Sequence, residues 1–128
     1  MKKKLLNENV KKTDIFLRKY LDKQAYSDLV PPMKYGVLSG GKKIRSSVVL
    51  GAGKLFNIGA VKLLNVCAAV ECIHSYSLIH DDLPCMDDDK IRRSKAATHI
   101  KYGESTAILA GNSLLTLAFE MIVDKNYK

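Results

Sequence analysis

The sequence predicts an all-α protein, and three observations favour this fold class. Apolar residues recur at three- and four-residue intervals along most of the chain, which is the spacing of one helix face. No alternation of apolar and polar residues is long enough to predict a sheet. The chain has 128 residues, of which 47% are apolar and 27% charged, and this composition is typical of one globular domain.

Two helices are predicted in the first half of the chain. Apolar residues share one face over 5–29, and the two prolines that follow are expected to end this helix. A second helix is expected to begin near Pro32, to bend or break within 36–41, and to resume at Ile44. Asn57 and the glycine two residues later are expected to stop it.

Two more helices are predicted in the second half. Residues 60–80 are apolar on almost every face, which places this helix at the centre of the protein with other helices around it. The segment 81–95 is acidic and then basic, so it is not expected to pack as core. A last helix is predicted from about Glu104 to Asp124.

Charge and cysteine content exclude several classes of protein. The net charge is +8, and its excess lies mainly in the first 34 residues, where no aromatic residues follow the pattern of a nucleic-acid binder. We therefore predict a solvated basic helix and no nucleic-acid partner. Cys67, Cys72 and Cys85 form no CxxC pair, which favours reduced thiols and a cytoplasmic protein. The chain shows no secretory signal, and polar residues interrupt its longest apolar stretch, so no membrane-spanning segment is expected.

The segment 81–89 holds five carboxylates at the end of an apolar helix, where the helix dipole is negative. Like charges so close together disfavour ionisation unless a cation is present. Oxygen donors without His or Cys suit Mg²⁺ best. An EF-hand would need a glutamate at the twelfth loop position, where Arg92, Arg93 or Thr98 stands instead. A solvated acidic loop is the alternative.

Basic residues on both sides of the acidic run indicate phosphate binding. The chain has 17 lysines and four arginines, yet Arg45, Arg92 and Arg93 all lie in the GGKKIR segment 40–45 or just after the acids. Arginine grips phosphate through two hydrogen bonds from a planar fork. Together with Mg²⁺, this predicts a diphosphate substrate. A P-loop is the runner-up because 36–42 fits GxxxxGK, but a lysine follows in place of the Ser or Thr that binds Mg²⁺.

The three histidines have different expected roles. His74 lies two helical turns before Asp81 and is expected on the same helix face. His80 adjoins the acidic pair but is expected to point elsewhere, and His99 is interpreted as a loop contact or as a residue without a role. A zinc site that combines His74 with the three cysteines fits no common ligand spacing.

Three segments together resemble the trans-isoprenyl diphosphate synthases, the polyprenyl synthetase family. These segments are GGKKIR at 40–45, ECIHSYSLIHDDLPCMD at 71–87, and the arginine pair at 92–93. The likeness runs from about residue 30 to the end of the chain and is strongest toward the bacterial farnesyl diphosphate synthases. It implies the N-terminal helices of the all-α isoprenoid synthase fold, in which helices surround a deep cavity.

The resemblance also implies an activity and a set of site residues. The activity is the Mg²⁺-dependent, head-to-tail condensation of isopentenyl diphosphate with dimethylallyl or geranyl diphosphate to give farnesyl diphosphate. The implied catalytic residues are Asp81, Asp82, Asp87 and Arg92, of which the three aspartates would bind Mg²⁺ and Arg92 the allylic diphosphate. The implied ligands of isopentenyl diphosphate are Lys42, Arg45, His74 and Arg93. The implied limits on product length are Tyr76 and Ser77, in a pattern that favours a C15 product.

The sequence departs from the family in its length and at single positions. Family members are about twice as long or more and carry a second aspartate-rich motif, so residues 1–128 are expected to be the N-terminal part of one polyprenyl synthetase domain, truncated before that motif. Ser46 stands where the family usually has Pro. Two outcomes stay open: an enzyme that needs the rest of the fold, from a longer chain or from a separately encoded C-terminal half, or an inactive fragment that still binds diphosphate. The resemblance further implies a homodimer.

Overall fold

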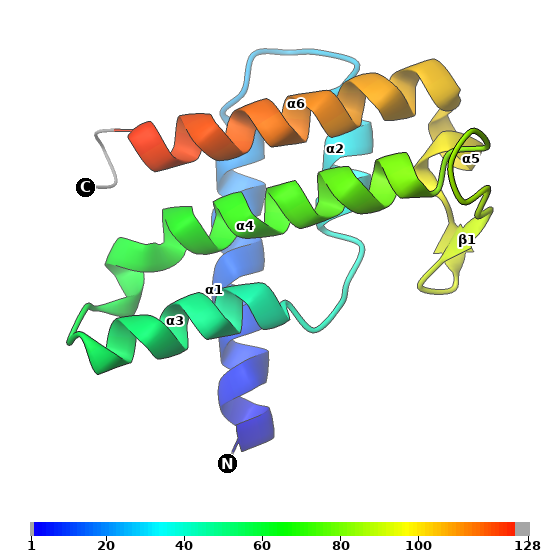
Figure 1. Ribbon diagram of the computed structural model, residues 1–128. Coiled ribbons are helices and arrows are strands. Elements are labelled where there is room, and N and C mark those ends of the chain that lie inside the picture. The colour runs from blue at the N-terminus through cyan, green and yellow to red at the C-terminus, as the bar shows by residue number, and fades with distance from the viewer. Residues whose placement is uncertain (1, 125–128) are drawn as a thin grey trace.

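The computed structural model describes residues 2–124, and most of this length is helical (Figure 1). The helices are α1 (Lys2–Asp22), α2 (Val30–Val37), α3 (Ile44–Leu55), α4 (Ala60–Asp81), α5 (Thr98–Tyr102) and α6 (Glu104–Val123). Over the same residues, the only sheet is a two-stranded antiparallel hairpin of β1 (Ile91–Arg92) and β2 (Lys95–Ala96). The predicted all-α fold class is confirmed. The predicted domain 1–128 also includes residues 1 and 125–128, which lie outside the described part.

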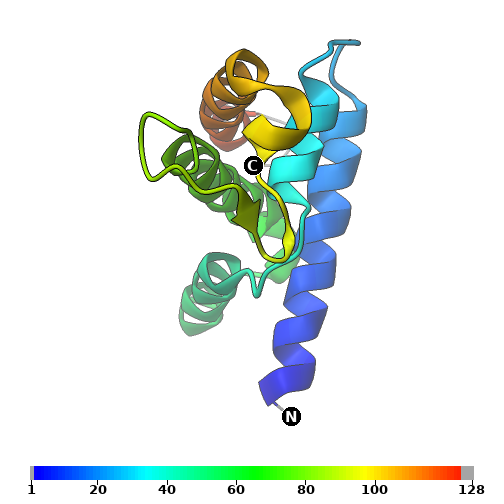
Figure 2. The same cartoon turned by 90° about the vertical axis from the view of Figure 1, so that its right-hand side faces the viewer.

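The long helices form two layers (Figure 2). In one layer, α3, α4 and α6 lie side by side and run antiparallel, and α1 crosses behind them with α2 beside it. The hairpin and α5 lie at one end of the α4 and α6 pair. Helix α4 contacts α1, α2, α3 and α6, which confirms the predicted central position of the helix over 60–80.

The first helix ends earlier than its apolar pattern predicts. Helix α1 stops at Asp22, and the segment 23–29 forms turns in which the N–H of Val30 donates to the carbonyl of Ser27 at 3.1 Å. The prolines at 31 and 32 stand in the first turn of α2 instead of ending α1. Proline is accepted there because the first N–H groups of a helix have no intrahelical acceptor. The proline pair therefore marks a helix start, and the predicted end of the first helix near residue 29 is wrong.

The other predicted helix boundaries agree with the structure. The break expected within 36–41 separates α2 from α3, and both Gly40 and Gly41 there have positive φ angles of 96° and 97°. Such angles are accessible to glycine at little cost. The predicted helices at 60–80 and 104–124 correspond to α4 and α6 within one residue at each end.

The core lies where α1, α4 and α6 meet. Leu17 and Leu21 of α1, Cys72 of α4, and Leu114 and Met121 of α6 are all fully buried in one apolar cluster. Each buried side chain of this size contributes about 1.5–3 kcal/mol through removal of apolar surface from water. This cluster fixes the positions of the three helices.

Among residues 2–124, α6 is the one helix that is long and apolar enough to cross a membrane, judged by length and composition alone. No membrane-spanning segment is predicted from the sequence. In the structure α6 packs along α4 and contributes Leu114, Leu117 and Met121 to the core. This packing explains why its sequence is so apolar.

Helices α4 and α6 approach closely at Gly111. The ring of His80 lies against this glycine, and a Cβ at position 111 would collide with the imidazole. Nε2 of His80 lies 3.0 Å from the carbonyl oxygen of Ile108, and the imidazole makes an edge contact with Tyr76 at 4.9 Å between ring centroids. His80 therefore points to α6 and away from the acidic segment.

Candidate functional site

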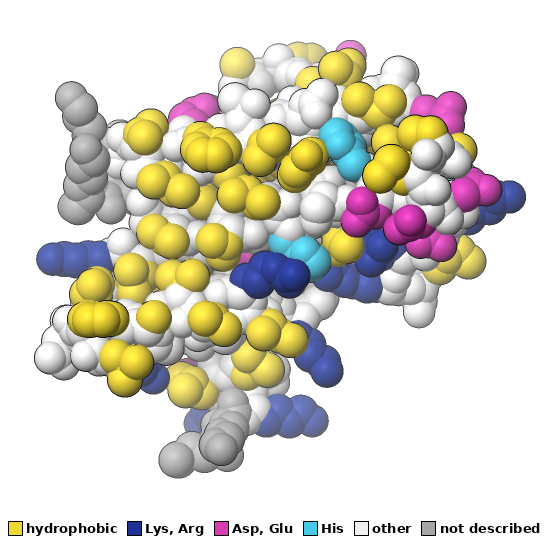
Figure 3. Space-filling view, in the orientation of Figure 1, with side chains coloured by type: hydrophobic (Ala, Val, Ile, Leu, Met, Phe, Trp, Pro, Cys, Tyr) yellow, Lys and Arg dark blue, Asp and Glu magenta, His cyan; other side chains and the backbone are white. Residues whose placement is uncertain are grey.

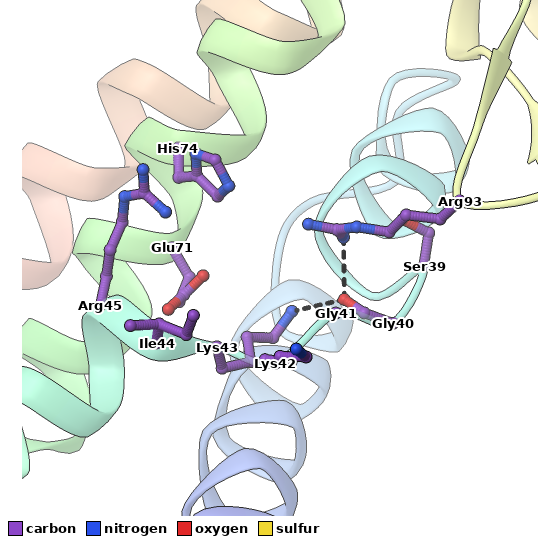
Figure 4. Close-up of a pocket in the computed structure, with 10 residues that line it drawn as sticks. All are labelled: Ser39, Gly40, Gly41, Lys42, Lys43, Ile44, Arg45, Glu71, His74 and Arg93. Carbon is purple, nitrogen blue, oxygen red and sulfur yellow. Dashed lines mark hydrogen bonds between the residues drawn. The ribbon is translucent and has the colours of Figure 1, made fainter.

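A pocket of about 530 Å³ opens between the start of α3, the middle of α4 and the turn of the hairpin (Figure 4). Its lining residues are Ser39, Gly40, Gly41, Lys42, Lys43, Ile44, Arg45, Glu71, His74 and Arg93. The structure thus brings together the four residues predicted to hold one diphosphate, from three separate segments of the chain. Glu71 is the one carboxylate among these lining residues.

The floor of the pocket is a loop that depends on glycine. Nη1 of Arg93 donates to the carbonyl of Gly40 at 2.8 Å, and the same guanidinium lies over Gly41, where a Cβ would come within 2.7–2.9 Å of it. Arg93 and Ser94 are the two central residues of the hairpin turn and have φ angles of 51° and 63°. This is the turn type that suits tight hairpins. The hairpin therefore carries Arg93 across to the glycine pair.

The two lysines of the GGKKIR segment point in different directions. The side chain of Lys43 is buried, donates to the carbonyl of Val37 at 2.7 Å, and lies 3.5 Å from a carboxylate oxygen of Asp14. Within the described residues, the side chains of Lys42 and Arg45 make no hydrogen bond or ion pair. Lys43 is a structural residue, whereas Lys42 and Arg45 are available to a ligand.

His74 completes the group of available side chains. Its ring makes no hydrogen bond to the described residues, and Figure 4 shows it beside the guanidinium of Arg45. Burial lowers the pKa of His74, the positive charge of Arg45 lowers it further, and Arg93 and Arg92 act in the same direction against an opposing effect of Glu71. The dominance of cations over the single carboxylate shows that this part of the pocket favours an anion.

Glu71 is buried although it lines a basic pocket. Its Oε1 accepts hydrogen bonds from the N–H of Ser46 at 3.0 Å and from the hydroxyl of Ser46 at 2.8 Å. Sequence analysis assigned no role to Glu71 or Lys43. The signal for Glu71 was available, because a charged residue on an apolar central helix requires a partner.

Within the acidic segment, the two adjacent aspartates have different surroundings. Asp82 is 2% exposed and accepts two hydrogen bonds from Arg92, from Nε at 2.8 Å and from Nη2 at 2.7 Å. These hydrogen bonds raise the pKa of Arg92. Asp81 is half-buried and makes no side-chain hydrogen bond to the described residues. Asp82 is therefore committed to a structural ion pair, and Asp81 is not.

Backbone hydrogen bonds fold the acidic loop back onto the end of α4. The N–H of Asp87 donates to the carbonyl of Asp81 at 2.8 Å, and the N–H of Asp89 donates to the carbonyl of Asp82 at 3.1 Å. Asp87 is exposed, and its side chain, like that of Asp81, makes no hydrogen bond or ion pair within residues 2–124. The fold thus holds Asp81 and Asp87, the first and last residues of the DDLPCMD segment at 81–87, close together in space.

The metal ligands predicted from sequence can be compared with this geometry. Over the described part of the chain, no three His, Cys, Asp or Glu residues form a ready metal cluster. Asp81 and Asp87 nonetheless offer unengaged carboxylates on adjacent backbone, and oxygen donors of this kind fit Mg²⁺. The metal roles of Asp81, Asp82 and Asp87 stay predictions.

Two alternatives considered from the sequence are not supported. A P-loop requires a strand before the glycine-rich loop, but α2 precedes the loop and includes Gly36, so the P-loop alternative is wrong. The cysteines do not assemble with His74 into a site, since Cys67 and Cys72 are buried and Cys85 is exposed. Burial raises the pKa of Cys67 to about 11 and that of Cys72 to about 12, so both are protonated thiols at neutral pH.

The residues predicted to limit product length lie one helical turn before the acidic segment. Tyr76 packs against the core cluster and contacts His80, while the hydroxyl of Ser77 donates to the carbonyl of His74 at 2.7 Å. Their role in product length stays a prediction.

Residues 27–128 match the Polyprenyl synthetase family, so the chain, with its helical fold and its basic pocket beside an aspartate-rich loop, belongs to this family. Among its relatives, the farnesyl diphosphate synthase of Buchnera aphidicola subsp. Acyrthosiphon pisum is 52% identical over 96 residues, which cover 75% of this chain and 34% of that protein. The farnesyl diphosphate synthase of Escherichia coli (strain K12) is 52% identical over 96 residues, which cover 75% of this chain and 32% of that protein. The chain thus spans about a third of the length of these relatives.

Solved structures show the same fold. The crystal structure of an FPP/GFPP synthase from Zymomonas mobilis superposes with a TM-score of 0.92 at 36% identity, covering 98% of this chain and 46% of that one. A geranyltransferase from Legionella pneumophila superposes with a TM-score of 0.90 at 36% identity, covering 94% of this chain and 43% of that one. The resemblance to the polyprenyl synthetases that the three sequence segments indicate is confirmed.

Proposed function

We propose that these helices provide the diphosphate-binding part of a Mg²⁺-dependent prenyltransferase. Its reaction is the condensation of isopentenyl diphosphate with dimethylallyl or geranyl diphosphate to give farnesyl diphosphate. The observation that carries the proposal is the convergence of Lys42, Arg45 and His74 around one pocket, where their side chains make no hydrogen bond or ion pair with the described residues. The farnesyl diphosphate synthases among its relatives support the choice of substrates.

The basic pocket suits the diphosphate of isopentenyl diphosphate. Arg45 offers two parallel N–H donors to phosphate oxygens, and Lys42 adds a mobile point charge. A bound diphosphate would raise the pKa of His74 and so favour the protonated ring, which then donates a further hydrogen bond. In this proposal the pocket neutralises and orients one substrate before any bond changes.

The acidic loop suits the second, allylic substrate. Asp81 and Asp87 would hold Mg²⁺, which when bound neutralises the charge that develops on the departing diphosphate. Asp82 orients Arg92 through their two hydrogen bonds, and this leaves one guanidinium nitrogen, Nη1, free to meet an anion. The chain's own contribution is electrostatic and positional.

Binding is tested by isothermal titration of the 128-residue chain with isopentenyl diphosphate. Loss of the charge-assisted hydrogen bonds in Arg45→Gln is expected to weaken binding by about 10- to 100-fold. Lys54→Gln is the matched control, because Lys54 lies on the same helix, is exposed, and does not line the pocket. Equal affinities for wild type and Arg45→Gln would refute the proposed site.

A second candidate is a chain that binds diphosphate but does not turn it over. It is favoured by the apolar surface that covers one face of α3, α4 and α6 (Figure 3). Leu55, Val61 and Phe119 on these helices are 83%, 82% and 63% exposed. The relatives are more than twice as long as this chain, and this surface is suited to contact the further chain that they contain.

The two candidates are separated by an assay for prenyl products. The chain is incubated with Mg²⁺, isopentenyl diphosphate and geranyl diphosphate, alone and with the remaining segment of the Escherichia coli relative. We expect product only in the second arm, and Asp81→Ala is expected to lower that rate by several orders of magnitude. Product from the chain alone would contradict the second candidate, and no product in either arm would contradict the first.

Two further features of the whole enzyme belong to the same proposal. We place the activity in the cytoplasm, which is supported by the absence of any disulfide among the three cysteines. We also propose that the assembled enzyme is a homodimer, on the basis of the family resemblance.

A further inference from the structure

Ser46 is a fully buried polar residue at the contact between α3 and α4. Its N–H and its hydroxyl both donate to Oε1 of Glu71, at 3.0 and 2.8 Å, and the hydroxyl also lies 3.3 Å from the carbonyl of Cys67. Glu71 is itself only 3% exposed. Hydrogen bonds to a charged group in such a dry environment are among the stronger polar interactions in proteins.

These hydrogen bonds cap the N-terminus of α3. The N-cap residue, Lys43, has a positive φ of 45° and supplies no side-chain cap. The first intrahelical bond runs from the N–H of Ser47 to the carbonyl of Lys43 at 3.1 Å, so the N–H of Ser46 has no acceptor within its own helix. The carboxylate of Glu71 caps α3 from the neighbouring helix and carries the charge that a helix N-terminus favours.

The capping bonds lie next to the proposed diphosphate ligands on both helices. Arg45 directly precedes Ser46, and His74 lies one helical turn after Glu71 on the same face of α4. Figure 4 shows Arg45 and His74 side by side, with Glu71 next to them. Any movement between the first turn of α3 and the middle of α4 therefore changes the separation of Arg45 and His74.

Proline is an informative replacement at position 46. Proline would remove both donors to Glu71. Its ring would instead fix φ near the helical value, and it is accepted here because the N–H of residue 46 needs no intrahelical acceptor. A ring and a pair of hydrogen bonds are thus two ways to hold the same turn.

We propose that Ser46 and Glu71 are positioning residues of the diphosphate pocket, whose paired hydrogen bonds hold the first turn of α3 so that Arg45 faces His74. This inference rests on the proposed diphosphate site, and it concerns residues that contact no substrate. Proline at position 46 performs the same task by ring closure.

Substitutions at position 46 test the idea directly. In titrations of the 128-residue chain with inorganic pyrophosphate, Ser46→Ala is expected to weaken binding by about two- to tenfold, the range that corresponds to one net hydrogen bond. Ser46→Pro is expected to restore wild-type affinity. Ser47→Ala is the matched control, because the adjacent hydroxyl of Ser47 is buried but has no hydrogen-bond partner among the described residues.

Substitutions at position 71 keep the test informative if Ser46→Ala fails to fold. Glu71→Gln retains an oxygen that accepts both hydrogen bonds and is expected to bind pyrophosphate at least as tightly as wild type. Glu71→Met removes the acceptor and is expected to weaken binding, but to have no such effect in the Ser46→Pro background, where the ring holds the turn. Equal weakening by Glu71→Met in both backgrounds would overturn the proposal.

The pKa of His74, measured by NMR titration, is a readout that does not need a ligand. Arg45 lowers this pKa, so Ser46→Ala is expected to shift it upward, toward the value in Arg45→Gln, and Ser46→Pro is expected not to shift it. The other charged groups that act on His74 are Glu71, Arg92 and Arg93, and a released Glu71 would raise the pKa in the same direction.

The outcomes separate this inference from the proposed function. If wild type binds no pyrophosphate, the diphosphate site is wrong. The titration of His74 still decides whether Ser46 positions Arg45, because a shift that Ser46→Ala causes through Arg45 is absent in the Arg45→Gln background, whereas a shift caused through Glu71 persists there. If wild type binds but Ser46→Ala has the same affinity and the same His74 pKa, the positioning role is wrong and the diphosphate site stands. Failure of Ser46→Pro to restore affinity would also overturn the positioning role.

Discussion

Replacement of Arg92 is expected to destabilise the whole acidic loop. Arg92→Met leaves the carboxylate of Asp82, which is 2% exposed, without the two hydrogen bonds it accepts at 2.7 and 2.8 Å. Breaking a buried ion pair from one side costs about 3–5 kcal/mol. The side chain of Arg92 is 33% exposed, so part of the interaction is screened by water, and we expect a loss of about 2–4 kcal/mol.

This loss is measurable by thermal unfolding followed by circular dichroism. For a chain of this size, about 1 kcal/mol corresponds to a change in Tm of about 3–5 °C, so Arg92→Met is expected to melt about 6–20 °C below wild type. Asp82→Asn is expected to fall in the same range, because its amide would present a donor to the guanidinium.

The matched control is the neighbouring aspartate. Asp81→Asn removes a half-buried carboxylate that makes no side-chain hydrogen bond within residues 2–124, and its free energy of unfolding is expected to stay within about 0.5 kcal/mol of wild type, a change in Tm of about 2 °C. The double variant Asp82→Asn with Arg92→Met should lose less than the sum of the single losses. Equal Tm values for Asp82→Asn and Asp81→Asn would refute the structural assignment of Asp82.

Three further outcomes follow from the described geometry. Gly41→Ala should weaken pyrophosphate binding, because its Cβ would meet the Arg93 guanidinium at 2.7–2.9 Å, whereas Gly51→Ala, in open space, should not. Because the folded state lowers the pKa of His74, the contribution of this residue to the free energy of unfolding is fully present above pH 6.5 and is lost below it, where the unfolded chain binds the proton first. His74→Gln should flatten this part of the pH profile of stability measured by urea denaturation. Cys72, with its pKa raised to about 12, should stay unreactive toward Ellman's reagent in the folded protein.

Helix positions could be predicted from sequence wherever one local pattern decided them. The apolar segment at 60–80 has few polar interruptions, and the structure makes it the central helix α4. The end of α1 was not predictable in this way, because an amphipathic pattern continues past Asp22 although the backbone turns there. Residues 23–29 face α2 and α6 across pockets, and that tertiary setting is absent from a local pattern.

Site residues were predictable as types, but their partners were not. The arginines in the GGKKIR segment and just after the acidic run predict Arg45, Arg92 and Arg93 as anion ligands, and in the structure each has different surroundings. Arg45 is unengaged, Arg93 donates to the carbonyl of Gly40, and Arg92 is paired with Asp82. Charge patterning specifies which residues gather, whereas the distribution of hydrogen bonds among them depends on a hairpin too short to be predicted.

The tight crossing of α4 and α6 couples residue 111 to two aromatic rings on α4. The imidazole of His80 fills the volume that any larger residue would need at Gly111, and the same imidazole abuts the phenol of Tyr76. Enlarging position 111 therefore displaces one ring and, through it, a second ring that the resemblance associates with product length. The size of residue 111 on α6 therefore controls where the Tyr76 ring lies on α4.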